Sequence, residues 1–155
     1  MKHAWPLAAI AGALAVPSLA SARTVTLETT LSNYGGDGAY LAIYLTDASG
    51  AYKSTLWVAA PKAKYWRHLS DWYRATGGKA KVDGISGASV GAGTTLRVTA
   101  DVADALLDAG YQIHIDAAVE DMRDSPSEIV VPLTSSGAGQ PAAGRAYVQS
   151  FTYSM

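Results

Sequence analysis

The residues from Lys81 to Gly93 combine reactive side chains with an unusual lack of bulk. Asp83 supplies a carboxylate, and Ser86 and Ser89 supply hydroxyls, whereas most of their neighbours are glycine or alanine. Stretches rich in glycine and serine usually serve as flexible connections. Composition alone therefore predicts a solvated loop, and any more specific role depends on the order of the residues.

The order of residues 83–89 resembles the acceptor motif of bacterial flavin transferases, which reads Asp-x-x-Ser/Thr-Gly-Ala-Thr/Ser. The positions that make up this stretch of the motif include Asp83, Gly84, Ser86, Gly87, Ala88 and Ser89. The resemblance implies that the hydroxyl of Ser89 is esterified to the phosphate of FMN. Small neighbours suit this chemistry, because an acceptor hydroxyl must enter the active site of another enzyme. Threonine is the commoner acceptor, and the primary alcohol of Ser89 can form the same phosphoester.

Nearly the whole chain from residue 23 to 155 resembles a family of predicted periplasmic proteins found beside PepSY-type membrane reductases and flavin transferases. The resemblance is carried by a strand at 40–45, an aromatic segment at 64–74, the motif at 83–89 and a strand at 111–120. It implies an exported electron carrier with covalent FMN. The implied partners are a flavin transferase and a PepSY-type reductase, and one implied use of the electrons is iron reduction.

An aromatic segment precedes the motif. Helical spacing of its apolar residues predicts one helix between residues 61 and 77, which ends at the glycines that follow. We expect Leu69 and Trp72 to pack on a sheet. Trp66 and Tyr73, seven residues apart, are the better candidates to face a flavin ring. The basic residues that could hold a phosphate, or equally form a solvated face, are Arg67, Arg74, Lys79 and Lys81.

Most of the remaining chain alternates apolar and polar residues with the period of two that is typical of half-buried strands. The expected strands cover 23–33, 39–46, 52–59, 94–99, 110–120, 128–133 and 146–153. The second and third are expected to form a hairpin, and residues 101–108 suit a turn or a single helical turn. This pattern predicts a mainly β fold, an Ig-like β-sandwich of about seven strands with one short helix, and a small barrel is the alternative.

The first 22 residues predict a cleavable secretory signal. Lys2 and His3 precede an apolar run over residues 7–16, and the small-residue pattern Ala20-Ser21-Ala22 predicts cleavage after Ala22. A membrane anchor is the competing interpretation, but a spanning helix needs about 20 apolar residues. We therefore expect residues 23–155 to form one periplasmic domain with no membrane insertion after cleavage.

Composition excludes several classes of function. The chain has no cysteine, which rules out disulfides and thiolate chemistry. All 13 acidic residues but only 11 of the 12 Lys and Arg residues follow residue 22, so the expected mature chain carries a formal charge of −2, which argues against nucleic acid as a partner. The acidic residues Asp116, Glu120, Asp121 and Asp124 lack the spacing of a calcium loop, and the sequence leaves open whether they bind a metal.

The alternative function is a non-catalytic β-sandwich that binds a protein or a small ligand in the periplasm. In that case residues 83–89 are an ordinary loop. The two hypotheses differ in where they expect Ser89, because an acceptor hydroxyl must be reachable, whereas a buried Ser89 would favour the binding module.

Overall fold

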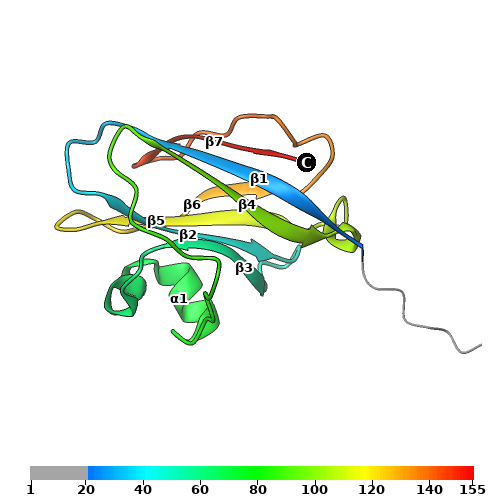
Figure 1. The fold of residues 1–155 in the computed structure, drawn as a ribbon, viewed down its shortest axis with the longest axis horizontal. Helices are drawn as coiled ribbons and strands as arrows, with labels where there is room; N and C mark the ends of the chain where they lie inside the picture. The colour runs from blue at the N-terminus through cyan, green and yellow to red at the C-terminus, as the bar shows by residue number, and fades with distance from the viewer. Residues whose placement is uncertain (1–20) are drawn as a thin grey trace, which may run out of the picture.

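A computed structural model describes residues 21–155 and shows seven strands with a small helical region (Figure 1). The strands are β1 (Ala22–Leu31), β2 (Ala39–Thr46), β3 (Tyr52–Ala59), β4 (Thr95–Ala103), β5 (Gln112–Val119), β6 (Ser125–Pro132) and β7 (Val148–Ser154). The helices are the 3₁₀ helix η1 (Ala63–His68), the α-helix α1 (Ser70–Thr76) and the 3₁₀ turn η2 (Asp104–Leu106). The prediction of a mainly β fold with about seven strands is confirmed.

The strands form two sheets that pack face to face as a sandwich (Figure 1). One sheet has the order β4-β1-β7 and the other the order β3-β2-β5-β6. Neighbouring strands in both sheets run antiparallel, and β2 and β3 form the predicted hairpin. The helical region covers the outer face of the four-stranded sheet, on the side away from the other sheet (Figure 1).

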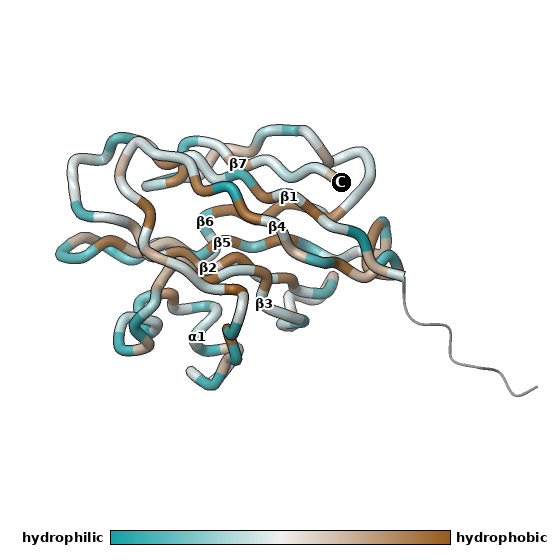
Figure 2. Tube along the Cα trace, in the orientation of Figure 1, coloured by the Kyte–Doolittle hydropathy of each residue, from teal (hydrophilic) through white to brown (hydrophobic). Residues whose placement is uncertain are grey.

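The main core lies between the sheets, where alternate residues of each strand meet. On β1 these are Val25, Leu27 and Leu31, all fully buried. Hydrophobic residues concentrate along the strands and polar residues in the connections (Figure 2). β2 is buried on both faces for most of its length, because its outer face lies beneath the helices.

A second core fills the space between the four-stranded sheet and the helical region. Its centre is the edge-to-face pair of Trp66 and Trp72, whose ring centroids lie 5.2 Å apart. The expected packing of Leu69 and Trp72 is confirmed, since both are fully buried. The members of this cluster are Ala42, Tyr44, Val58, Ala60, Trp66, Leu69, Trp72 and Ala118.

The prediction of one helix between residues 61 and 77 is wrong in one respect. Leu69 has φ −87° and ψ 69°, outside the helical region, so the chain breaks there into η1 and α1. Gly77 ends α1 in the left-handed conformation, as the sequence predicts. β4 also extends to Ala103, so only residues 104–106 of the expected turn at 101–108 are helical.

The predicted export signal lies outside the described residues, except for Ser21 and Ala22. Ala22 pairs with Ala103 at the start of β1. The predicted cleavage site therefore falls between the first and second residues of this strand. Within the described residues, the structure has no helix long and apolar enough to cross a membrane.

Candidate functional site

The first half of the motif lies along the edge of the four-stranded sheet. Gly84, with φ 76°, forms a tight turn near the start of the motif. Ser86 makes an isolated parallel bridge with Val58 of β3. The N–H of Val58 donates to the carbonyl of Ile85 at 2.9 Å, and the N–H of Gly87 donates to the carbonyl of Val58 at 3.0 Å. The backbone is thus fixed at the middle of the motif.

A second anchor follows directly after the motif. Val90 and Ala39 of β2 exchange two backbone hydrogen bonds, of 2.9 Å from the Val90 N–H and 2.7 Å from the Ala39 N–H. Ala88 and Ser89 therefore span a short gap between two points that are hydrogen-bonded to the same sheet. The stretch is a solvated loop, as its composition predicts, and its backbone is hydrogen-bonded to the sheet on both sides of Ser89.

Ser89 itself is exposed, as an acceptor hydroxyl requires. Gly38 lies beside it, and a Cβ atom added at Gly38 would come within 2.9 Å of the Ser89 Oγ. Gly87 is in close contact with Trp57, since an added Cβ would lie 3.0 Å from its ring. Glycine at these two positions leaves room for the hydroxyl on one side and lets the motif lie against β3 on the other.

Ser89 lines a pocket of about 220 Å³, which we call the serine pocket. Two tyrosines form its wall: Tyr40 of β2 and Tyr65 of η1 stack with ring centroids 4.9 Å apart and planes inclined by 12°. The Lys64 Nζ lies 5.0 Å from the centroid of the Tyr65 ring. Other residues of the serine pocket are Pro61 and Lys62. A hydroxyl, a cation and an aromatic wall thus converge at one place.

The same two tyrosines border a larger pocket of about 360 Å³, which we call the acidic pocket. On its rim, the Nδ1 of His68 lies 3.2 Å from the Oδ2 of Asp124. Its lining besides the tyrosines consists of His68, Ala118, Val119, Glu120, Asp121, Met122 and Asp124. Three of the four members of the acidic cluster seen in the sequence therefore surround one cavity.

The fourth member, Asp116, lies elsewhere and is fully buried. Its carboxylate accepts hydrogen bonds from the Tyr44 hydroxyl at 2.9 Å, the Trp72 N–H at 2.8 Å and the Ser127 N–H at 2.7 Å. Burial raises the pKa of Asp116, and these donors offset part of the rise. Within residues 21–155, no three His, Asp or Glu residues are grouped so as to hold a metal ion.

A third pocket of about 290 Å³ lies at the other end of the helical region, and we call it the Tyr44 pocket. Its polar groups largely satisfy one another. The Ser127 hydroxyl donates to the Asp71 Oδ2 at 2.7 Å and lies 3.2 Å from the Nδ1 of His114. The Nε2 of His114 lies 3.0 Å from the Thr46 hydroxyl. Burial lowers the pKa of His114, which favours the neutral ring.

The aromatic residues expected to face a flavin do not form the wall of the serine pocket. Trp66 is only 8% exposed and its indole N–H donates to the carbonyl of Ala60 at 2.9 Å, so its expected outward orientation is wrong. Tyr73 is 38% exposed but lines neither the serine nor the acidic pocket. The reason is the break at Leu69, since residues on two separate helices do not follow the spacing of one.

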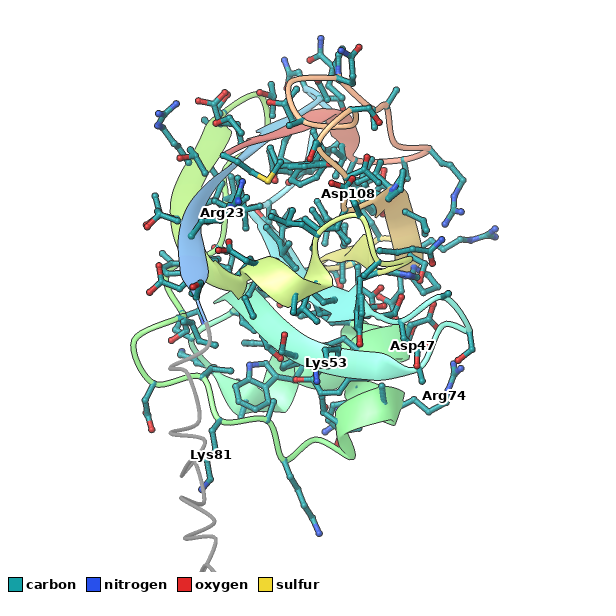
Figure 3. All side chains as sticks on the ribbon, turned by 90° about the vertical axis from the view of Figure 1, so that its right-hand side faces the viewer. Arg23, Asp47, Lys53, Arg74, Lys81 and Asp108 are labelled. Atoms are coloured by element: carbon teal, nitrogen blue, oxygen red, sulfur yellow. The ribbon has the colours of Figure 1, made fainter. Side chains whose placement is uncertain are left out.

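The expected phosphate-binding residues are also dispersed. Arg74 lines the Tyr44 pocket, where its Nη2 lies 3.4 Å from the Asp71 Oδ1. Lys81 points away from the domain, and the two side chains lie on different sides of the helical region (Figure 3). Arg67 and Lys79 are exposed and line none of the three pockets. Lys62, which the sequence analysis did not single out, is the cation in the serine pocket.

A family comparison now bears on the identity of the chain. The model of the family described as predicted periplasmic protein (DUF2271) matches residues 22–150. The chain belongs to this family. The matched range runs from the start of β1 into β7 and includes the motif and all three pockets of this DUF2271 domain. The family description agrees with the periplasmic location expected from the sequence. No curated protein and no solved structure matches the chain.

Proposed function

We propose that this protein is a periplasmic electron carrier whose FMN is attached through a phosphoester to the Ser89 Oγ. The observation that carries the proposal is the exposure of the Ser89 hydroxyl on a fixed backbone. Its hydroxyl is exposed between two backbone anchors, with glycine at position 38 leaving it clear. A buried Ser89 would have favoured the binding module instead.

The attachment needs an activated FMN donor, and a flavin dinucleotide meets this need. The Ser89 Oγ attacks the phosphorus on the FMN side of its phosphoanhydride, and an Oγ–P bond forms as the P–O bond to the other nucleotide breaks. The nucleoside monophosphate leaves, and the proton of the serine hydroxyl passes to a base of the flavin transferase. No electrons are gained or lost in this step.

The residues around Ser89 fit such a group. The phosphodiester keeps one negative charge, and Lys62 lines the same pocket to balance it. Asp83 and Ser86 are exposed on the same segment, so a transferase can contact them while it acts on Ser89. Tyr40 and Tyr65 offer aromatic surface beside the attachment point.

A bound flavin would supply the electron-transfer chemistry, and the protein would position it and shape its surroundings. The proposed donor is a PepSY-type membrane reductase, and the proposed acceptor lies outside the cytoplasmic membrane, with ferric iron as one candidate. These partners are inferred from the resemblance of the chain to a family found beside PepSY-type membrane reductases and flavin transferases. Covalent attachment suits this location, since a dissociated cofactor would be lost from the periplasm.

The test is the intact mass of protein exported from a host that also produces a flavin transferase. The wild-type protein should gain one FMN less one water, and so should Ser89→Thr, which keeps an acceptor hydroxyl. Ser89→Ala should gain nothing. Ser136→Ala is the matched control, because Ser136 is an exposed serine in another segment of small residues. An unmodified wild-type mass, or an adduct that survives Ser89→Ala, would overturn the proposal.

The binding module is the second candidate function, and the acidic pocket favours it. Its volume of about 360 Å³ lies within the range of small-molecule sites, and its lining combines aromatic, aliphatic and charged groups. A wild-type protein that stays unmodified beside an active transferase, yet binds a small periplasmic ligand, would support this function.

A further inference from the structure

We infer that the acidic pocket binds the flavin ring. The isoalloxazine tethered at Ser89 lies in this pocket, against the Tyr40–Tyr65 pair. The inference rests on the proposed attachment and adds to it the position of the ring. It also assigns a role to a cavity in which no residue belongs to the motif.

Tyr40 and Tyr65 line the serine pocket and the acidic pocket alike, so the two cavities lie beside the same stacked pair. The serine pocket is the smaller and holds Ser89 and Lys62, which suits the phosphate and the sugar-alcohol chain. The acidic pocket is larger and is lined by the same two tyrosines, which suits the ring.

An isoalloxazine has flat aromatic faces, a methylated edge and an edge with N–H and C=O groups. The acidic pocket offers a tyrosine wall for a face, and Val119 and Met122 for apolar contact. Glu120 and His68 on its lining can meet the polar edge. The pocket therefore contains a complement to each part of the ring.

The Tyr44 pocket, at the other end of the helical region, does not suit a ring tethered at Ser89. On the outer face of the sheet, Tyr40 pairs with Ala118, whereas Tyr44 pairs with His114, four residues later on β2 and four earlier on the antiparallel β5. The Tyr44 pocket therefore lies at the opposite end of this face, and it contains no residue of the serine pocket. Its hydroxyl and imidazole groups are already engaged with one another.

The inference has a consequence for the electrochemistry of the flavin. Glu120, Asp121 and Asp124 place carboxylates around the acidic pocket, with His68 as the basic residue of its lining. Negative charge around the ring disfavours the addition of electrons to it. The bound flavin should therefore have a lower reduction potential than the same protein with one of these charges removed.

The first test measures the fluorescence emission per flavin in the attached protein, after intact mass has shown the adduct. A tyrosine in contact with an excited flavin quenches it by electron transfer, so Tyr65→Leu should raise the emission severalfold. Tyr65→Phe keeps the stacked ring but lacks the readily oxidised phenol, so it should raise the emission as Tyr65→Leu does. Tyr73→Leu is the matched control, an exposed tyrosine on the neighbouring helix, and should change nothing.

The second test covers the case in which Tyr65→Leu does not fold. Glu120→Gln changes an exposed residue and should raise the reduction potential of the flavin. Glu28→Gln is its control, because Glu28 lies on β1 in the other sheet, and it should leave the potential unchanged.

The outcomes separate the two proposals. Attached protein in which Tyr65→Leu and Tyr73→Leu emit alike, or in which Glu120→Gln and Glu28→Gln have the same potential, overturns the ring position and leaves the attachment intact. A wild-type protein without an adduct overturns the attachment, and with it the position of the ring.

Discussion

The carboxylate of Asp116 accepts the backbone N–H of Trp72 at 2.8 Å, although the two residues are 44 positions apart. This bond ties the first turn of α1 to the centre of β5. The other carboxylate oxygen accepts from Tyr44 on β2 and from the backbone of Ser127 on β6. One buried side chain thus holds the helical region against three strands.

Asp116→Asn should destabilise the protein by about 2–3 kcal/mol, because the amide NH₂ cannot accept and at least one buried donor loses its partner. Urea unfolding followed by tryptophan fluorescence measures the change. Asp121→Asn is the matched control, an exposed acid of the same sequence cluster, and should stay within about 0.5 kcal/mol of the wild type. Equal losses in the two variants would contradict the role assigned to Asp116.

His114 should make the protein less stable as the pH falls. Burial lowers its pKa below the ordinary 6.5, so the unfolded chain binds the proton more readily than the folded one. Stability is therefore fully present above pH 6.5 and declines as the pH drops through that value toward the lower folded pKa. The free energy of unfolding, measured from pH 7.5 to 5, should fall more steeply in the wild type than in His114→Gln. Parallel curves would contradict this.

Gly38→Ala should reduce flavin attachment without unfolding the protein. The new Cβ would lie 2.9 Å from the Ser89 Oγ and force the hydroxyl out of its present position. The fraction of flavinylated protein, from intact mass, should fall severalfold, while the unfolding free energy changes by less than about 1 kcal/mol. In the control Gly91→Ala, the new Cβ meets Thr94 at an ordinary 3.6 Å, so attachment should match the wild type. Equal attachment in Gly38→Ala and Gly91→Ala would contradict the role assigned to the space beside Gly38.

Glu128→Ala should destabilise the protein by about 2–3 kcal/mol. Its buried Oε1 accepts three successive backbone N–H groups, of Ala146, Tyr147 and Val148, at 2.6–2.9 Å. Truncation leaves these donors without a partner as the chain enters β7. Denaturant unfolding measures the loss. Glu28→Ala, which removes a partly exposed carboxylate paired with Arg97, should cost less than about 1 kcal/mol.

The strands could be predicted because their signal is local. The predicted ranges 39–46 and 52–59 coincide with β2 and β3, since period-two alternation and a turn at 47–50 bound both strands. The break at Leu69 could not be predicted in this way. It follows from packing Trp66, Leu69 and Trp72 together on a sheet face, which is a tertiary contact.

In the candidate site, too, features with a local signal could be predicted and features made by tertiary contacts could not. The motif could be recognised because it belongs to one continuous stretch, whereas the sequence left open whether Ser89 is exposed or buried. The stacking of Tyr40 on Tyr65 joins β2 to η1 and has no local signature. The alternation along β2 does place Tyr40 on the face opposite to Leu41, and that was the available signal. Asp116 was grouped with its acidic neighbours, whereas strand alternation points it to the face that α1 covers.

The paired backbone at Gly87 and Val90 bears on the order in which the protein matures. Only the folded sheet brings β3 and β2 together to hold the backbone on both sides of Ser89, so the shape that the proposed transferase would meet exists only after folding. A free peptide with the sequence of residues 83–89 should be a poorer acceptor than the whole domain. Yellow colour would then mark the molecules that have folded correctly.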